Sequence, residues 1–498
     1  MSLIISNRDP EKALLAEMLA SDKAEFLTIY GRRRIGKTFL IREFFEKNKK
    51  VLFFKAVGLK QGTMATQLKN FVTQISTTFY NGAQLTSSKN WKEAFSLLTN
   101  AINSAQVGKR KIVLFLDELP WMATKNSNLL QNLDYFWNLH WSVNPTVKLI
   151  ACGSSASWMI NKIINNKGGL HNRTTRKIHL RPFTLKEIKE FLKSKKVSLS
   201  NEQITQLYMV TGGVPFYLSN ITPGLSAAQI IEQLAFSPDG LLLDEFNALF
   251  SSLFDDHTIY IEMLRIIAES QAGIGQDDLL KRFEKSLQGK GGLDKLQALE
   301  DADFIISFKP HFHKKKGIYY KVIDEYTLFY FHWIEPIKET LQNRNLEKGN
   351  WLELQNTPAW NTWCGYAFEA ICYKHVSAIR NTLGISPSAI ANSWRYAPTP
   401  SKGSTERGAQ IDLLFDRQDD TITLCEIKYT KDPFAITKDY AEILRRKMTI
   451  FKERTKTKKH LVMAMITAHG LKNNPIVLQN KTSEDLISGV VTLDDFFH

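Results

Sequence analysis

Cysteine is scarce in this sequence, and long apolar runs are absent. Only four cysteines occur among 498 residues, without a C-x-x-C pair and among apolar neighbours. We therefore expect reduced, buried thiols, and neither disulfides nor a zinc cluster. Apolar stretches such as Ile112–Leu116 are far shorter than the roughly 18 residues that a membrane span needs. Because Arg8 and Asp9 come before any apolar signal-peptide region, we expect a cytoplasmic protein without membrane association.

Internal repeats and low-complexity tracts are also missing, which argues against solenoid and largely disordered proteins. What is present is ordinary for folded protein, with 43% hydrophobic and 23% charged residues. A chain of this length should form about two to four domains. The formal charge of +15 suits a polyanion partner, because clustered Lys and Arg release counterions from phosphates. A generally basic surface without such a partner remains the alternative.

The first part of the chain alternates short apolar runs with longer amphipathic ones. This pattern is typical of strands that alternate with helices in a parallel α/β sheet. From about residue 184 to 235 the apolar residues recur at helical spacing around the turn Gly212–Pro215, which predicts a helical lid. We place the first domain at residues 1–240. The predicted strands are Phe26–Tyr30, Val51–Phe54, Ile112–Leu116, Val147–Ala151 and Ile178–Leu180.

Two further domains are predicted after the lid. Residues 241–345 show three helix-like segments and then two extended runs, the order of a winged helix-turn-helix. The turn between the runs, His311–Gly317, carries three consecutive lysines, which favour contact with phosphate over reading of bases. The alternative is a winged helix that serves only as a packing module. The third domain, residues 346–498, begins near a predicted helix at Trp363–Ile379.

A phosphate-binding motif lies directly between a predicted strand and a predicted amphipathic helix. Glycines in such a loop let backbone N–H groups close around phosphates, and the following helix N-terminus adds positive potential. Lys37 would reach the β and γ phosphates of ATP, and the Thr38 hydroxyl would hold Mg²⁺. The motif, G-x4-G-K-[ST], comprises Gly31, Arg32, Arg33, Arg34, Ile35, Gly36, Lys37 and Thr38.

A second element of the predicted ATP site is the apolar strand that ends in Asp117 and Glu118. At the C-terminal end of a parallel strand both side chains can reach the phosphate crevice. Asp117 would bind Mg²⁺ through water, and Glu118 would act as the general base that polarises the attacking water. The alternative is a strand that simply ends in a solvated acidic turn.

Two further polar positions follow the later strands. Ser154 or Ser155 stands where a sensor of the γ-phosphate would lie, although a plain turn fits this pattern nearly as well. Arg173 or Arg176 could reach the γ-phosphate of ATP bound to a neighbouring subunit and neutralise charge in the transition state. The alternative for both arginines is a solvated basic loop.

Five of these motifs, in order, resemble those of the archaeal-type AAA+ ATPases related to origin-recognition and STAND proteins. The resemblance covers roughly residues 1–240. It implies a P-loop AAA+ fold, ATP hydrolysis coupled to a conformational change, and assembly into a homo-oligomer. The matching segments are Arg8–Glu11, Gly31–Thr38, Asp117–Pro120, Gly153–Ser155 and Gly212–Pro215.

A second group of candidate functional residues lies in the last third of the chain. Glu426 and Lys428 are two residues apart on a strand-like run, so they share a face, and a hairpin can set Asp412 beside them. Two acids and a lysine there could hold Mg²⁺ or Mn²⁺ that activates water, while Lys428 positions or deprotonates the nucleophile. Glu369, on the preceding helix, could complete the cluster.

This spacing resembles the PD-(D/E)XK nuclease superfamily, although Ile411 stands where the motif has proline. ATPases of the family named above commonly carry such a domain. The resemblance therefore implies an α/β restriction-endonuclease-like domain at the C-terminal end. The alternative is a ladder of solvated charges on an exposed hairpin.

Taken together, the sequence predicts an ATP-hydrolysing protein that acts on DNA and carries a metal-dependent nuclease domain. A second hypothesis is an ATP-operated signalling or scaffold protein whose C-terminal domain binds nucleic acid or a partner without cutting it. A third is a transcription regulator that uses only the winged helix. Cleavage lost on changing Asp412 or Glu426 would separate the first hypothesis from the others.

Overall fold

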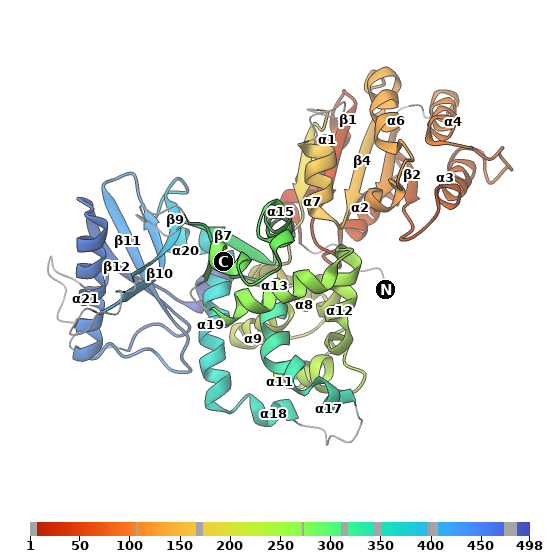
Figure 1. Ribbon diagram of the computed structural model, residues 1–498. Coiled ribbons are helices and arrows are strands. Elements are labelled where there is room, and N and C mark those ends of the chain that lie inside the picture. The colour runs from red at the N-terminus through yellow and green to blue at the C-terminus, as the bar shows by residue number, and fades with distance from the viewer. Residues whose placement is uncertain are drawn as a thin grey trace. The chain divides into compact units, whose positions relative to one another are not determined.

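The computed structural model divides the chain into two compact units. One comprises Met1–Pro182 with Leu253–Asp255, and the other comprises Phe183–Ser252 with Asp256–His498. Figure 1 colours the first unit red to yellow and the second yellow-green to blue. The structure describes residues 7–105, 108, 110–165, 173–270, 273–309, 317–342, 350–396, 398, 407–472 and 486–498.

The first unit is built around a five-stranded sheet with the order β2-β3-β4-β1-β5, in which every pairing is parallel. This confirms the predicted parallel α/β sheet. The strands are apolar on both faces because helices cover both sides, as parallel sheets require. Their bounds are β1 (Glu25–Tyr30), β2 (Val51–Val57), β3 (Lys111–Asp117), β4 (Val147–Gly153) and β5 (Arg176–His179).

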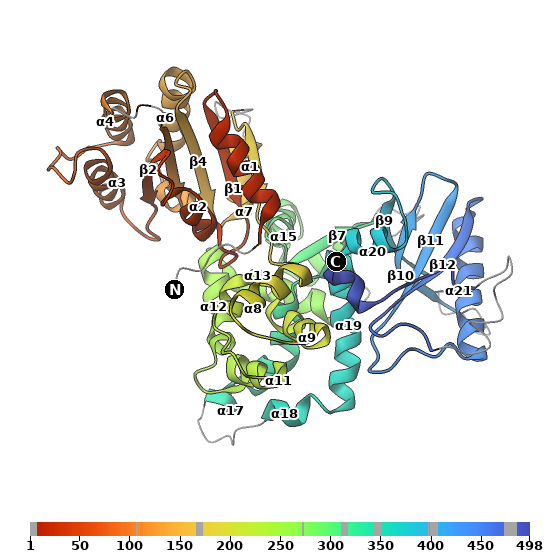
Figure 2. The same cartoon turned by 180° about the vertical axis from the view of Figure 1, so that it is seen from behind.

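Two separate cores lie on the two faces of this sheet. Helices α1 and α2 pack on one face, against Leu27 and Ile29 of β1. Helices α3, α4 and α6 pack on the other face, which includes Phe26 and Leu114; Figures 1 and 2 show the two layers. The helices of this unit are α1 (Asp9–Ala20), α2 (Lys37–Phe45), α3 (Met64–Phe79), α4 (Trp91–Ser104), α5 (Leu119–Met122), α6 (Leu129–Phe136), η1 (Trp137–Trp141), α7 (Ala156–Met159) and η2 (Ile160–Ile164).

The second unit begins with the predicted lid, which is helical. Gly212 caps α9 with φ 60°, and Gly213 follows with φ 71°. A Cβ atom on Gly213 would lie 2.3 Å from the Phe183 carbonyl oxygen, so this turn requires glycine. The lid helices belong to the second unit, whereas the predicted first domain runs to residue 240. They are α8 (Leu185–Ser194), α9 (Asn201–Thr211), α10 (Pro215–Ser219), α11 (Ala227–Ile231) and η3 (Glu232–Phe236). Helix α12 (Leu241–Leu253) follows the lid.

Next come three helices followed by a hairpin of β7 and β8, in the order that the sequence predicted. A short strand between the first two helices, β6, was not predicted and completes a small antiparallel sheet with the order β6-β8-β7. The predicted tip of the hairpin, His311–Gly317, lies outside the described residues except for Gly317. The elements are α13 (His257–Glu269), β6 (Ile274–Gly275), α14 (Gln276–Leu280), η4 (Lys285–Leu287), α15 (Lys290–Asp301), β7 (Ile305–Phe308), β8 (Tyr319–Val322), α16 (Glu325–Phe329), η5 (Tyr330–Ile334), η6 (Glu335–Ile337), α17 (Lys338–Gln342) and α18 (Asn350–Leu354).

The last part of the second unit is a five-stranded mixed sheet with the order β13-β12-β11-β10-β9. Strands β9, β10 and β11 are antiparallel, and β11, β12 and β13 are parallel. Helix α21 covers one face of this sheet through Ala441, Leu444 and Phe451 (Figure 1). The elements are α19 (Pro358–Lys374), α20 (Val376–Thr382), β9 (Ile390–Tyr396), β10 (Ala409–Asp416), β11 (Thr421–Lys428), α21 (Lys438–Thr455), β12 (His460–Thr467), β13 (Gly489–Val491) and η7 (Leu493–Phe497).

One predicted helix, Trp363–Ile379, differs in its bounds. The structure starts it earlier, at Pro358, and breaks it at His375, which separates α19 from α20. At the break, the His375 ring and its backbone N–H both bond the carbonyl oxygen of Ile371. All four cysteines are buried and free of disulfides, as the sequence predicted.

Candidate functional site

The phosphate-binding loop joins β1 to α2 at the carboxyl end of the sheet. Gly31 has φ 137°, and a Cβ atom there would lie 2.2 Å from the Leu180 carbonyl oxygen, so only glycine fits. Gly36, with φ 91°, leads into α2. The Lys37 ammonium donates hydrogen bonds to the carbonyl oxygens of Gly31 and Arg32, each at 2.8 Å. The loop thus wraps around a lysine whose burial lowers its pKa.

The other loop residues serve the surrounding structure. Ile35 is buried in the core under α1 and α2. Arg32 is buried, whereas Arg33 and Arg34 are half-buried. Arg8, just before α1, donates to the Arg181 carbonyl oxygen at 2.6 Å. The predicted N-terminal motif therefore contacts the strand-end segment that also packs on Gly31.

Thr38 and Asp117 meet beside this loop. The Thr38 hydroxyl donates to both carboxylate oxygens of Asp117, at 2.9 and 3.1 Å. Lys55, near the end of β2, has its ammonium 3.8 Å from Asp117 Oδ2. The structure thus joins the two residues predicted to hold Mg²⁺ and adds Lys55, which sequence reasoning missed because β2 and β3 are far apart in the chain.

Glu118 and Ser154 also meet, across the ends of β3 and β4. The Ser154 backbone N–H and hydroxyl both donate to Glu118 Oε2, at 3.0 and 2.8 Å. Glu118 has the left-handed backbone conformation, with φ 49°, which is uncommon for residues other than glycine. The predicted general base is thus held in one orientation by the predicted sensor serine.

The two arginines that were candidates for contact with a neighbouring subunit are in different environments. Arg176 forms ion pairs with Glu17 at 2.9 Å and with Glu25 at 3.5 Å, within its own unit. Arg173 lies in an exposed turn before β5. Of the two, Arg173 is the more exposed, and its predicted role stays a prediction.

In the second unit, β10 and β11 bring together Asp412, Glu426 and Lys428. The pairing of β10 with β9 shifts register between Ile411 and Leu414, so Asp412 lies within a β-bulge. Its carboxylate accepts hydrogen bonds from the Ile427 backbone N–H at 3.1 Å and from Gln410 at 3.3 Å. Burial, with the charges of Glu426 and Glu369, raises the pKa of Asp412 to about 7. Carboxylates are therefore crowded at this end of the sheet.

Glu426 is held by three side chains, of which sequence reasoning named only Lys428. The Lys428 ammonium lies 3.2 Å from Glu426 Oε1, which also accepts a hydrogen bond from Tyr440 at 2.8 Å. Lys447 donates to Glu426 Oε2 at 2.6 Å. Burial favours a higher pKa for Glu426, but Lys447, Lys428 and Tyr440 outweigh it and lower the pKa. Tyr440 and Lys447 are seven residues apart on α21, so they share a helix face.

Glu369, on α19, pairs with a different lysine. The Lys321 ammonium of β8 donates to Glu369 Oε2 at 2.9 Å and lies over the ring of Tyr373. Among the described residues, no group of three or more His, Cys, Asp and Glu side chains is arranged to hold a metal ion. The inclusion of Glu369 with Asp412 and Glu426 in one metal site thus stays a prediction.

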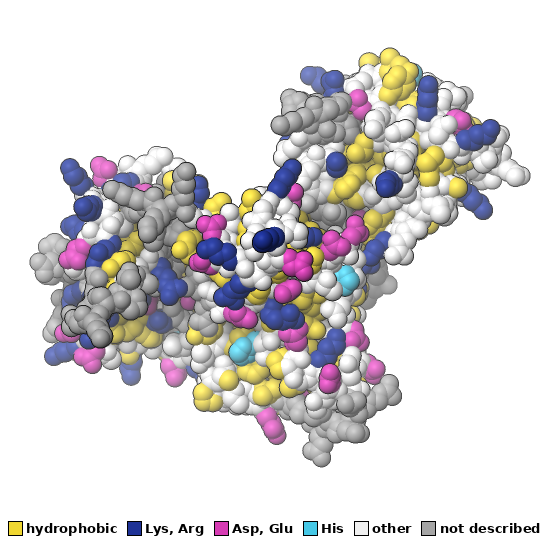
Figure 3. All heavy atoms as spheres, in the orientation of Figure 1, with side chains coloured by type: hydrophobic (Ala, Val, Ile, Leu, Met, Phe, Trp, Pro, Cys, Tyr) yellow, Lys and Arg dark blue, Asp and Glu magenta, His cyan; other side chains and the backbone are white. Residues whose placement is uncertain are grey.

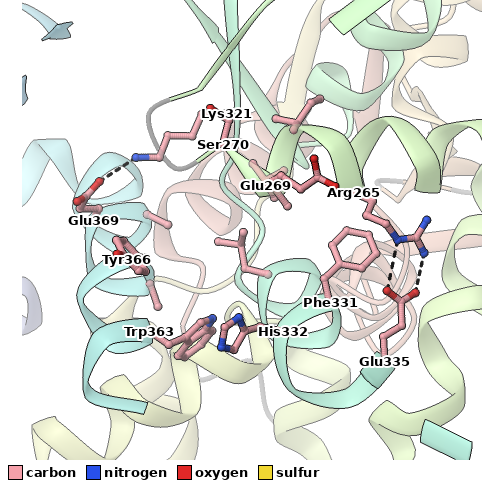
Figure 4. Close-up of a pocket in the computed structure, with 16 residues that line it drawn as sticks. Arg265, Glu269, Ser270, Lys321, Phe331, His332, Glu335, Trp363, Tyr366 and Glu369 are labelled. Atoms are coloured by element: carbon pink, nitrogen blue, oxygen red, sulfur yellow. Dashed lines mark hydrogen bonds and ion pairs between the residues drawn. The ribbon is translucent and has the colours of Figure 1, made fainter. Parts of the chain in front are cut away.

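A cavity of about 320 Å³ lies beside the Lys321–Glu369 pair, between α13, β8, η5 and α19. Figure 4 shows that pair at one end and the Arg265–Glu335 pair at the other. Four ring side chains line the space between them: Phe331, His332, Trp363 and Tyr366. The cavity therefore combines aromatic walls with hydrogen-bonding groups at both ends.

The surface does not concentrate the positive charge in one place on the face shown in Figure 3, where Lys and Arg are interspersed with Asp and Glu. The formal charge of +15 therefore does not by itself locate a nucleic-acid surface. No helix among the described residues has the length and apolar character that crossing a membrane requires.

Comparison with known proteins matches the part of the chain that holds the phosphate-binding loop and the first lid helices. Residues 5–221 match the family model of an ATPase domain predominantly from Archaea. An uncharacterized protein of Methanocaldococcus jannaschii is 26% identical over 430 residues, which are 85% of this chain and 87% of that protein. An uncharacterized ATP-binding protein of the same organism is 47% identical over 45 residues, 9% of this chain and 75% of that protein.

Two solved structures are similar to this chain at lower sequence identity. A Walker-type ATPase of Pyrococcus abyssi has a TM-score of 0.46 and 16% identity, and covers 65% of this chain and 94% of its own. The ORC2 protein of Aeropyrum pernix, solved in ADPNP and ADP complexes, has a TM-score of 0.41 and 14% identity, over 68% of this chain and 96% of its own. Residues 5–221 are therefore similar to an ATPase domain that occurs predominantly in Archaea, and the loop between β1 and α2 has the phosphate-binding motif of such a domain.

Proposed function

We propose that this protein couples ATP hydrolysis in its first unit to metal-dependent cleavage of DNA in its second. Two groups of residues support the proposal. One is the phosphate loop with Thr38, Asp117 and Glu118, and the other is the cluster of Asp412, Glu426 and Lys428. The two parts of the proposal are independent enough to be tested separately.

The first unit has oxygen donors that fit Mg²⁺. The Thr38 hydroxyl and the Asp117 carboxylate are already within 2.9 Å of each other, and Mg²⁺ prefers such hard oxygen ligands. Bound there with ATP, the ion would neutralise charge on the phosphates. Lys37 would donate to the β and γ phosphates instead of the loop carbonyl oxygens, and Lys55 adds a further positive charge beside Asp117.

Glu118 is the residue that would accept a proton from the attacking water. Its Oε2 atom accepts two hydrogen bonds from Ser154, so Oε1 is the oxygen left to face water. A carboxylate held in this way acts without first having to be oriented. Ser154 is then a positioning residue in addition to its predicted place near the γ-phosphate.

The second unit has the residues that phosphodiester cleavage needs. Asp412 and Glu426 are buried carboxylates on paired strands, and Asp412 accepts a hydrogen bond from the backbone N–H of Ile427, the residue after Glu426. A divalent cation would relieve the repulsion between their charges. Such an ion supplies an activated water and stabilises charge on the phosphate. Lys447 and Tyr440 orient Glu426, and Lys428 is placed to bind the phosphate or orient the nucleophile.

The observation that carries the nuclease proposal is the contact of Glu426 with Lys428 at 3.2 Å on a strand beside Asp412. Purified protein should be incubated with linear, single-stranded and branched DNA, Mg²⁺ or Mn²⁺, and with or without ATP. We expect cleavage that Glu426→Ala abolishes. Lys37→Ala shows whether ATP hydrolysis controls it.

An exposed-surface variant such as Glu453→Ala, on the same unit, is the control for nonspecific effects. ATP hydrolysis without any DNA cleavage would favour the second hypothesis, a signalling or scaffold protein whose C-terminal domain binds without cutting. In that case binding of nucleic acid or a partner should change with the nucleotide state, and Asp412→Ala should leave it intact.

The region from α13 to β8 has the helix and strand order of a winged helix, and we propose that it contacts the DNA backbone. Its hairpin tip carries Lys314, Lys315 and Lys316, and lysines at such a tip favour phosphate contact. The proposed DNA partner, and a homo-oligomer through the ATPase domain, would both show in sedimentation with ATP and DNA present.

A further inference from the structure

The cavity beside Glu369 has a chemical character that the proposed reaction does not yet use. It shares Lys321 and Glu369 with the surroundings of the carboxylate cluster. Lys321 lies over the ring of Tyr373, and the Tyr373 hydroxyl donates a hydrogen bond to the backbone carbonyl oxygen of Asp412. A ligand in the cavity would therefore lie next to the proposed cleavage centre.

The walls of the cavity suit a flat ring. Phe331 and His332 come from η5, and Trp363 and Tyr366 come from α19. Figure 4 shows Trp363 and Tyr366 on the side of α19 that faces the cavity, with the His332 ring beside Trp363. Aromatic side chains bind bases of either type by stacking, because every base has a π face.

The charges in the cavity decide which part of a nucleotide belongs there. The lining includes three carboxylates, Glu269, Glu335 and Glu369, and two cations, Arg265 and Lys321. Both cations are already paired with carboxylates. The third carboxylate, Glu269, is likewise paired, with Arg282 at 3.3 Å. A phosphate would thus have to compete with carboxylates for both lining cations, whereas a neutral base would meet stacking surfaces and both donors and acceptors at its edges.

The volume is consistent with a single base and its sugar. At about 320 Å³, the cavity lies at the lower end of the roughly 300–1,000 Å³ of ordinary ligand pockets. Among its rings, Tyr366 is 38% exposed and His332 is also exposed, whereas Trp363 is 5% exposed and packs against Trp333 and Trp360. The cavity therefore has one ring held by its neighbours and two rings that solvent reaches.

We propose that this cavity binds one unstacked base of a DNA strand whose adjoining phosphate lies at Asp412 and Glu426. The proposal rests on the proposed nuclease function, which it deepens by naming the substrate form. Proteins that act on a strand in this way bind single strands, or take a base out of the stack at unpaired positions. Fully paired duplex is then the poorer substrate.

The test measures binding of the protein to a fluorescein-labelled single DNA strand of about 16 nucleotides. Binding is measured by fluorescence anisotropy, and EDTA is present so that cleavage cannot occur. Tyr366→Ala should weaken binding by about 5- to 150-fold, the range expected for loss of one stacked base. Tyr366→Phe should bind like the wild type. Tyr135→Ala, which removes a tyrosine that is 49% exposed in the other unit, is the matched control and should have no effect.

A second strand of the same length, with a run of abasic nucleotides, separates base from phosphate contacts. The wild type should bind it as weakly as Tyr366→Ala binds the normal strand, and Tyr366→Ala should not distinguish the two strands. Equal binding of both strands by the wild type would overturn the proposal, as would no binding at all. Base-dependent binding without cleavage in Mg²⁺ would retain the cavity assignment while removing the nuclease.

Discussion

The buried imidazole of His375 accepts a hydrogen bond at Nε2 from the backbone N–H of Leu185, at 3.1 Å. Its Nδ1 atom lies 2.8 Å from the Ile371 carbonyl oxygen. An acceptor at Nε2 and a donor at Nδ1 are available together only in the neutral ring. The last turn of α19 and the first residue of α8 are therefore joined through one uncharged tautomer.

Because the two hydrogen bonds of His375 require its neutral ring, we expect the protein to lose stability in acid. Burial lowers the pKa of His375 to about 4, whereas an unfolded histidine titrates near 6.5. The neutral His375 ring therefore makes its full contribution to the free energy of unfolding above about pH 6.5. This contribution is at most about 3 kcal/mol and is lost as the pH falls toward 4. Urea unfolding at pH 7 and pH 4.5 should show this difference for the wild type and a smaller one for His375→Gln. Equal pH dependence in both proteins would contradict it.

Ser154→Ala should slow ATP hydrolysis with little change in the affinity for ATP. The hydroxyl donates to Glu118 at 2.8 Å, and a hydrogen bond to a charged group contributes about 1.5–3 kcal/mol. We therefore expect kcat to fall by about tenfold to hundredfold. Ser155→Ala is the neighbouring control. Unchanged kcat in Ser154→Ala would show that the backbone N–H alone holds Glu118.

Arg173→Ala should remove a rate enhancement that depends on protein concentration. Arg173 is exposed, and an arginine supplied by a neighbour stabilises charge on the transferred phosphoryl group. The specific ATPase activity of the wild type should rise with concentration, and that of the variant should stay low. Arg445→Ala, an exposed arginine of the second unit, should behave like the wild type. Activity independent of concentration in the wild type would refute the neighbour role.

Lys447→Met should impair DNA cleavage, and Lys447→Arg should restore part of it. Lys447 contacts Glu426 at 2.6 Å, so its loss leaves Glu426 less firmly oriented. A misplaced catalytic group costs about tenfold to hundredfold in rate. The loss should appear in kcat and in the Mg²⁺ concentration for half-maximal activity, with DNA affinity unchanged. A variant that only weakens DNA binding would indicate a phosphate contact instead.

Gly213→Ala should destabilise the second unit more than Gly384→Ala. Both glycines have positive φ, 71° and 62°, but only Gly213 lies against backbone, with a Cβ position 2.3 Å from the Phe183 carbonyl oxygen. Strain from positive φ costs about 1–2 kcal/mol at either site. The additional clash should raise the cost at Gly213 by about 2 kcal/mol. Similar melting temperatures of the two variants would show that the turn can shift.

Local patterns in the sequence were sufficient to predict those site residues that lie close together in the chain or at the ends of strands. The loop from Gly31 to Thr38 follows from its own motif, and Glu426 and Lys428 share a face because strands have a period of two. Asp117 and Thr38 meet because the carboxyl ends of parallel strands share one edge. These predictions need no knowledge of how distant helices pack.

The contacts that escaped prediction depend on packing between distant segments. Lys447 lies on α21 and contacts Glu426 on β11, and the sequence does not show how that helix packs on the strand. Lys321 contacts Glu369 from a separate sheet. The break at His375 was also missed; its ring bonds Ile371 of the same helix and Leu185, which is 190 residues away in the chain. One signal for Lys447 was present, namely its seven-residue spacing from Tyr440 on an amphipathic helix.

The position of α9 limits where the chain can be cut into fragments that fold. Leu207, Tyr208 and Val210 of α9 are buried, and α9 packs against α16 and α19 of its own unit. A protein fragment that ends at residue 240 would lack α16 and α19. The apolar residues of α9 would then be exposed to solvent, and the fragment would tend to aggregate. A boundary at Pro182 would keep α9 with α16 and α19, but it would divide the segment 5–221 that matches a single ATPase domain.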